Sequence, residues 1–244
     1  MRFRYVAAAA LSVTLLAGCS ATTSGTAQPA RVNDASTPSR SVTTTTATTT
    51  AEPARVPVTI EGSTGDYLDT LAQNTLSALV TFWDKSGAVT KPMRYTYWES
   101  SAGEQSPMCA SRHQPEGVFC DRTRGEIDEL AWDKTHFGEL VNNSEVGAKA
   151  ASVMLLAHEY GHAVQEAQGN LRDNKHRELQ ADCLAGVFAA DYAPEITDER
   201  WGIASNHVYG FTRATADKVR NRIVAFSEGW YKKSAAHCNS YTGS

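Results

Sequence analysis

The segment His158-Glu159-Tyr160-Gly161-His162 constrains this chain more than any other feature. Two histidines at this spacing project from one face of a helix, so their imidazoles can share a single Zn²⁺ ion. The intervening glutamate then lies beside the open coordination position, where it can take a proton from a metal-bound water. We therefore expect a helix over residues 144–168. The apolar run Val153–Ala157 before the motif predicts that this helix is buried.

A third metal ligand is expected from a second helix, over residues 176–192. Glu178 and Asp182 lie one turn apart on this helix and share a face. Glu178 can complete a set of two histidines and one glutamate, which leaves the fourth position for water. Asp182 can accept the second ring N–H of a ligand histidine, most plausibly His158, and thereby select its tautomer.

Alternative interpretations of these two motifs are weaker. Gln165 and Gln168 stand where a metzincin would carry glycine and histidine, which excludes that class of zinc peptidase. The histidines could merely satisfy hydrogen bonds in a buried helix, and the two carboxylates could lie on a solvated face. The apolar residues around Asp182 argue against a solvated face, because a buried carboxylate needs a cation or a hydrogen-bond donor.

The two motifs resemble those of the bacterial neutral zinc metallopeptidases, a gluzincin-like family. The resemblance rests on H-E-Y-G-H-A-V-Q, E-L-Q-A-D-C-L-A-G-V, G-V-F-C and C-N-S-Y, at residues 158–165, 178–187, 117–120 and 238–241. It implies a zinc-dependent peptidase that holds one Zn²⁺ ion with His158, His162 and Glu178. Glu159 would be the catalytic base.

The chain departs from this family before its last predicted helix. Relatives carry Phe-Thr-His-Gly there, whereas this chain has arginine and alanine at Arg213 and Ala214. If the family histidine stabilises the oxyanion, Arg213 stands in its place and could do the same. His207 and Tyr209 are further candidates for polarising a substrate carbonyl. Alternatively, these two residues are ordinary polar residues at the surface or at the edge of the core.

The N-terminus predicts export and lipidation. A basic start and a short apolar stretch in residues 1–18 indicate a signal peptide, and Leu-Ala-Gly-Cys at its end resembles the bacterial lipobox. Cys19 would then be the lipidated N-terminus of the mature protein, outside the cytoplasmic membrane. The alternative is ordinary secretion with Cys19 incidental.

Residues 19–57 form a segment rich in Thr, Ser, Ala and Pro, which predicts a disordered tether. Residues 58–244 are long enough for one domain with its own core. A formal net charge of -4 and the absence of a clustered basic stripe give no reason to expect nucleic acid.

Four cysteines remain once Cys19 is assigned to lipid, and spacing alone leaves three pairings open. The family resemblance favours bridges between Cys109 and Cys120 and between Cys183 and Cys238. The second bridge would tie the C-terminus to the Glu178 helix.

The expected fold is α+β: a helix-dominated, zincin-like single domain with a small β-sheet beside the metal-binding helix. Further helices are expected over 66–83, 197–209 and 215–233, and strands over 93–98, 118–120 and 126–132. One strand edge is expected to receive an extended substrate. The stretch from Asp128 to Asp133 is expected to be a solvated edge.

The predicted function is hydrolysis of peptide bonds in a peptide or protein substrate by a lipid-anchored zinc endopeptidase. The alternative is a surface lipoprotein that zinc stabilises and that binds a partner with little or no turnover. The Arg213 departure favours this alternative, whereas the intact Glu159 opposes it.

Overall fold

Eight segments of the chain are described by a computed structural model. They are residues 55–88, 92–107, 116–121, 127–143, 145–171, 175–196, 198–210 and 216–243. All of them belong to one compact unit, Ala51–Ser244. The predicted signal peptide, Cys19, most of the predicted tether, Cys109 and Arg213 lie outside the described residues.

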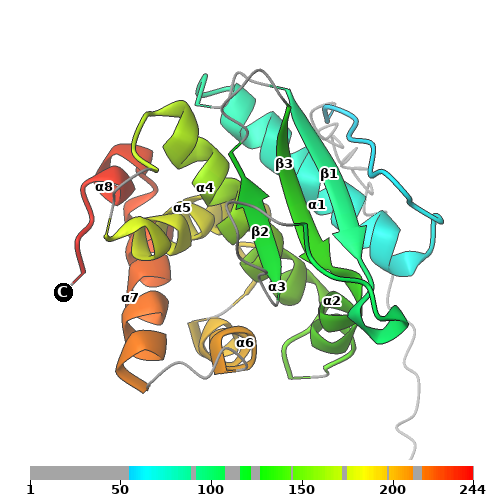
Figure 1. Cartoon of the computed structure of the whole chain (residues 1–244). Coiled ribbons are helices and arrows are strands. Elements are labelled where there is room, and N and C mark those ends of the chain that lie inside the picture. Colours follow the sequence, from blue (N-terminus) through cyan, green and yellow to red (C-terminus); the bar gives the residue numbers. More distant parts are fainter. Residues whose placement is uncertain are drawn as a thin grey trace, which may run out of the picture. The chain divides into compact units, whose positions relative to one another are not determined.

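The described residues form a helix-dominated α+β fold with one small mixed sheet, which confirms the predicted class (Figure 1). The strands are β1 (Met93–Trp98), β2 (Gly117–Cys120) and β3 (Asp128–Asp133). The longer helices are α1 (Tyr67–Asp84), α2 (Lys134–Asn142), α4 (His158–Ala167), α5 (Arg177–Tyr192), α6 (Asp198–Gly210) and α7 (Ala216–Lys232). The short elements are a 3₁₀ turn (Ser100–Ala102), α3 (Ala148–Ser152) and α8 (Ala235–Asn239). Among the described residues, no helix is both long and apolar enough to cross a bilayer.

The sheet has the order β1-β3-β2, with β1 parallel and β2 antiparallel to the central β3. All six residues of β3 are buried, so the prediction of a solvated edge at Asp128–Asp133 is wrong. Pairing on both sides buries this strand, and its acidic side chains have partners within the fold. Glu129 accepts hydrogen bonds from Arg94 and Thr96, and Asp133 caps the start of α2.

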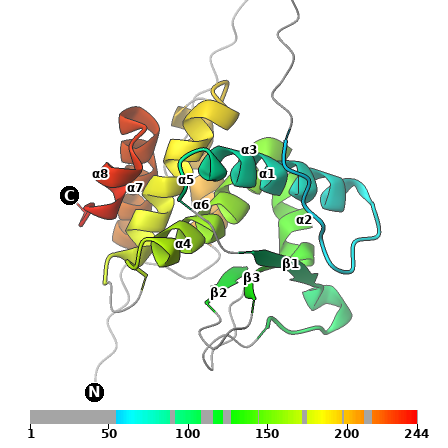
Figure 2. The same ribbon diagram turned by 90° about the horizontal axis from the view of Figure 1, so that it is seen from above.

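The edge strand β2 contacts α4, and Figures 1 and 2 both show these two elements side by side. The chain enters α4 through α3 and a π-helical turn, Val153–Ala157, so residues 148–167 form one nearly continuous helical run. Every residue of this turn is buried, as the apolar sequence predicts. Turns of this kind inside α-helices occur frequently at functional sites.

Glycines allow α4, α5 and α7 to approach one another closely. A Cβ atom at Gly161 would lie 2.9 Å from the Ala181 carbonyl oxygen, between α4 and α5. A Cβ at Gly229 of α7 would lie 1.8 Å from the Cys183 carbonyl oxygen of α5. Neither distance leaves room for a side chain, so these backbones are in direct contact. The approach at Gly161 brings the histidines of α4 within reach of the carboxylates of α5.

A disulfide between Cys183 and Cys238 ties α8 to α5, with 5.4 Å between the two Cα atoms. This confirms the second predicted bridge. Cys120 is also disulfide-bonded, while its predicted partner Cys109 lies outside the described residues.

Candidate metal centre

His158, His162 and Glu178 converge on one point, as the sequence predicts. One ligand atom from each of the three lies within 4.8 Å of the others. The Glu178 Oε2 atom is 3.3 Å from the Nε2 atom of His158 and 3.7 Å from that of His162. The two imidazole rings are nearly perpendicular, with centroids 4.9 Å apart. Helix α4 supplies the nitrogens and α5 supplies the oxygen.

The donor set fits a zinc ion. Ligand bonds of about 2.0–2.2 Å in a tetrahedral arrangement require ligand atoms roughly 3.3–3.6 Å apart, close to the separations of the Glu178 oxygen from the two nitrogens. In each histidine the Nδ1 atom is engaged by a side-chain oxygen, which leaves Nε2 for a metal. Two imidazoles, one carboxylate and a fourth open position are a common catalytic zinc set.

His158 is held by an ion pair. Its Nδ1 atom donates to Asp182 Oδ1 at 2.9 Å, which is the contact expected from the sequence. Arg222 of α7 donates to the same carboxylate with two nitrogens, at 2.7 and 3.0 Å. Asp182 has no exposed surface. Burial alone would raise the pKa of Asp182, but Arg222 and His158 outweigh it and lower this pKa, so the carboxylate is ionised.

Arg222 is the main functional residue that the sequence reasoning missed. Its Nη2 atom lies 3.2 Å from both ring nitrogens of His158, so it faces the ring rather than one lone pair. The same atom is 4.0 Å from Glu178 Oε2. Nothing in the local spacing of α7 marks this arginine, because its partners lie 40 and 64 residues earlier in the chain.

His162 is held by uncharged groups instead. Its Nδ1 atom donates to Gln165 Oε1 at 2.8 Å, one turn further along α4. Gln165 has no exposed surface and donates in turn to the carbonyl of Arg177 and to Gln180. The sequence pointed to Gln165 only as evidence against a metzincin, but its spacing of three residues from His162 could have indicated this contact.

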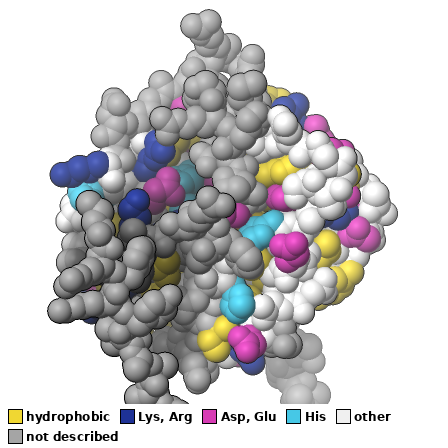
Figure 3. Space-filling view, turned by 60° about the horizontal axis from the view of Figure 1, so that its bottom comes forward, with side chains coloured by type: hydrophobic (Ala, Val, Ile, Leu, Met, Phe, Trp, Pro, Cys, Tyr) yellow, Lys and Arg dark blue, Asp and Glu magenta, His cyan; other side chains and the backbone are white. Residues whose placement is uncertain are grey.

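Glu159 is buried on α4 against the edge strand. A Cβ atom at Gly117 of β2 would lie 3.1 Å from its Oε1 atom, so glycine leaves room there for the carboxylate. Burial raises the pKa of Glu159, although both histidines oppose the shift. Glu116, next to Gly117, also interacts electrostatically with Glu159, and burial raises the pKa of Glu116 to about 7. Figure 3 shows histidine and carboxylate side chains lying beside one another on one face of the molecule.

The two predicted oxyanion-stabilising residues are not joined to this cluster by the contacts that the structure describes. His207 lies on α6, where its ring contacts the amide of Asn143 at 3.3 Å and Glu145 at 3.6 Å. Neither partner belongs to the metal cluster. Arg213 is outside the described residues. Its role, like that of His207, stays a prediction.

Comparison with known proteins gives a partial match. The chain is 34% identical over 90 residues to "Uncharacterized protein Rv2575" of Mycobacterium tuberculosis and "Uncharacterized protein Mb2605" of Mycobacterium bovis. The match covers 32% of this chain and 30% of each relative, so the chain spans less than a third of these proteins. No family model matches the chain, and no solved structure matches it. The metallopeptidase resemblance therefore rests on the motifs themselves.

Proposed function

We propose that this protein is a zinc-dependent endopeptidase. The observation that carries the proposal is the convergence of His158, His162 and Glu178 within 4.8 Å, with the buried Glu159 between the two histidines in α4. When bound, zinc supplies a Lewis acid that polarises a carbonyl and lowers the pKa of water.

Glu159 is the group suited to move the proton. A carboxylate whose pKa is raised by burial can accept a proton from the attacking water and release it to the departing amine. Gly117 keeps the start of β2 directly beside this carboxylate. The edge strand β2 is therefore the expected place for an extended peptide substrate, whose backbone would pair with the strand. Arg213 and His207 remain the predicted groups for stabilising the oxyanion.

The proposed location is the outer side of the bacterial cytoplasmic membrane, with lipid on Cys19 as the anchor. The support comes from the lipobox-like N-terminal sequence. Replacing Cys19 with alanine in cells should abolish incorporation of labelled fatty acid and release the protein from the membrane fraction. A membrane-bound, unlabelled Cys19→Ala variant would contradict this anchor.

The catalytic role is tested with Glu159→Gln and the matched control Glu166→Gln, which removes a charge two turns further along the same helix. Glu159→Gln should retain zinc and lose about 10²–10⁴-fold in the cleavage rate of an unstructured protein substrate. Glu166→Gln should cleave at the wild-type rate. Undiminished cleavage by Glu159→Gln would refute the mechanism.

The metal role is tested by metal analysis of Glu178→Ala. We expect zinc affinity to fall by more than about 100-fold, beyond the loss typical of outer-shell partners. Wild-type zinc content in this variant would refute the ligand assignment. Zinc binding by the wild-type protein without any chelator-sensitive cleavage would support the alternative of a zinc-stabilised binding lipoprotein.

A further inference from the structure

We propose that the disulfide-tethered C-terminal segment, residues 235–243, is part of the metal centre and positions His162 through Gln180 and Gln165. This inference rests on the proposed metal site but does not depend on peptide hydrolysis. It assigns a role to two glutamines and to a segment that follows the last long helix.

The first link is the amide of Gln165. Its Nε2 atom donates to the Arg177 carbonyl at 2.9 Å, and a carbonyl can only accept. The Oε1 atom must therefore face His162, whose Nδ1 atom lies 2.8 Å away. An acceptor at this position requires the proton of His162 to be on Nδ1. The lone pair of Nε2 is then directed at the cluster, 3.7 Å from Glu178.

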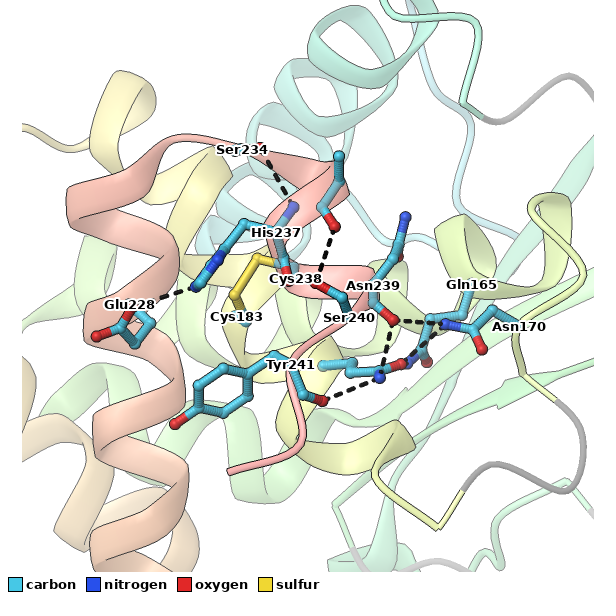
Figure 4. Close-up of a disulfide and its surroundings, with 12 residues drawn as sticks. Gln165, Asn170, Cys183, Glu228, Ser234, His237, Cys238, Asn239, Ser240 and Tyr241 are labelled. Carbon is cyan, nitrogen blue, oxygen red and sulfur yellow. Dashed lines mark hydrogen bonds and ion pairs between the residues drawn. A yellow bond between two sulfur atoms is a disulfide. The ribbon is translucent and has the colours of Figure 1, made fainter. Parts of the chain in front are cut away.

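The second link is the amide of Gln180 on α5, which contacts both Gln165 and the C-terminal segment. Figure 4 shows Asn239 of that segment beside Gln165 and Asn170. Its Nε2 atom donates to the carbonyls of Asn239 and Tyr241, at 3.1 and 3.0 Å. Because both partners can only accept, the Oε1 atom of Gln180 must face the other way. There it accepts from Gln165 at 3.3 Å and from Asn170 at 3.0 Å. Two backbone carbonyls of the C-terminal segment thus orient the Gln180 amide, which gives the second amide hydrogen of Gln165 its acceptor.

The third link is the tether that holds those carbonyls in place. Cys238 precedes Asn239 and is bonded to Cys183, which lies three residues after Gln180 on α5. The amide of Asn170 also donates to the Asn239 carbonyl, at 3.3 Å. Gln180 is buried, so loss of the Asn239 and Tyr241 carbonyls would remove two acceptors from its amide. Gln180 could then turn its amide, which would take an acceptor away from Gln165 and weaken the hold of Gln165 on His162.

Zinc affinity tests each link separately from catalysis. The zinc dissociation constant is measured by competition with a chromophoric chelator, using the full mature chain. Gln165→Met keeps the side-chain volume and should weaken zinc binding by about 10–100-fold. Gln180→Met and the double variant Cys183→Ser/Cys238→Ser act one link further away and should weaken it by about 3–10-fold.

Ser240→Ala is the matched control in the same segment. The Ser240 hydroxyl directly follows α8 and donates to the carbonyls of Ala236 and His237 in that helix, at 3.4 and 2.9 Å. It takes no part in the amide chain, so this variant should bind zinc within about twofold of the wild type.

The tautomer provides a second readout that a merely structural role would not move. Long-range proton–nitrogen NMR of the zinc-loaded protein should show His162 protonated on Nδ1 in the wild type. Gln165→Met should lose or broaden this signal, while the corresponding signal of His158 stays. Wild-type zinc affinity and an unchanged His162 signal in Gln165→Met would overturn the inference.

The role of the C-terminal segment is decided by Gln180→Met, because this variant keeps the disulfide and so avoids the general loss of stability that accompanies removal of a bridge. Wild-type zinc affinity in Gln180→Met and in the double cysteine variant would overturn that role. A wild-type protein that binds zinc but cleaves nothing would refute the proposed function and leave this inference standing.

Discussion

The two candidate histidine ligands lie one turn apart on the same helix, yet they are supported by opposite kinds of chemistry. His158 donates to the ionised Asp182, which Arg222 holds with two further hydrogen bonds. His162 donates to the neutral amide of Gln165, and that chain ends on backbone carbonyls near the C-terminus. A charged partner makes a ligand imidazole more basic, whereas a neutral amide mainly selects its tautomer.

The two kinds of support are sensitive to different substitutions. The ion pair is short and strong, but a buried carboxylate tolerates no loss of its counter-charge. The amide chain carries no charge, so its single links matter less for folding. Each amide in the chain must keep its orientation, however, and the last hydrogen-bond acceptors are carbonyls of the C-terminal segment.

The largest effect should come from breaking the ionic side with Arg222→Met. This variant removes the Arg222 guanidinium and its two hydrogen bonds from the buried Asp182 carboxylate, and we expect a loss of about 3–5 kcal/mol in the free energy of unfolding. Urea denaturation of the zinc-free protein measures it. Arg220→Met, at an exposed position of the same helix, should change stability by less than about 0.5 kcal/mol. We expect Gln165→Met to lower the free energy of unfolding by only about 1–3 kcal/mol. A loss as large as that of Arg222→Met would contradict the contrast between the two supports.

A smaller effect should follow from Gly161→Ala, which acts on both histidines together. The new methyl group meets the Ala181 backbone at 2.9–3.0 Å and should push α4 away from α5. We expect a cost of about 1–3 kcal/mol in stability and weaker zinc binding. Gly202→Ala in α6 is the control, because nothing lies within 4 Å of its Cβ position. That variant should gain about 0.5–1 kcal/mol from helix propensity. Unaltered zinc affinity in Gly161→Ala would show that the close approach of the helices is not needed for the metal site.

The pH dependence of stability should also separate the two sides. The pKa of Asp182 is lower in the folded protein than the value of about 3.9 expected in the unfolded chain. Its stabilising contribution is therefore complete above the unfolded pKa and is lost as the pH falls through the folded pKa. In zinc-free protein, Asp182→Asn should flatten the acid limb of stability below about pH 4. Gln165→Met should leave the shape of that limb unchanged, since an amide does not titrate. Equal acid limbs in the wild type and Asp182→Asn would contradict this assignment.

A further pH effect should come from Glu116, which interacts electrostatically with Arg222, Glu159 and His158. Burial raises its pKa to about 7 in the folded protein, against about 4.3 in the unfolded chain. The folded state therefore binds the extra proton in this range, and stability should decline as the pH rises from about 4.3 to 7. Glu116→Gln removes this decline. The denaturation midpoints of the zinc-free wild type and Glu116→Gln are measured at pH 4.5 and 7.5. An equal fall in midpoint between these pH values in both proteins would rule out this role of Glu116.

Most helices were predictable because their signals are local. The helix predicted over residues 66–83 agrees with α1 to within one residue at each end. The expected helix over residues 176–192 is α5, which begins at Arg177. The expected motif helix starts later than predicted, at Ala148, and contains a π-helical turn that no spacing rule indicates. The acidic residues of Asp128–Asp133 suggest exposure to solvent, but the stretch is buried because it pairs with both β1 and β2.

Spacing along two helices is enough to predict the three candidate ligands, the neighbouring Glu159 and the Asp182 contact. The groups that support these candidate ligands become visible only in the folded chain. Arg222 reaches Asp182 across 40 residues, and the C-terminal carbonyls reach Gln180 across about 60. Such contacts depend on how closely the helices pack, which glycine residues and a disulfide govern here, and no periodicity along the chain encodes that distance.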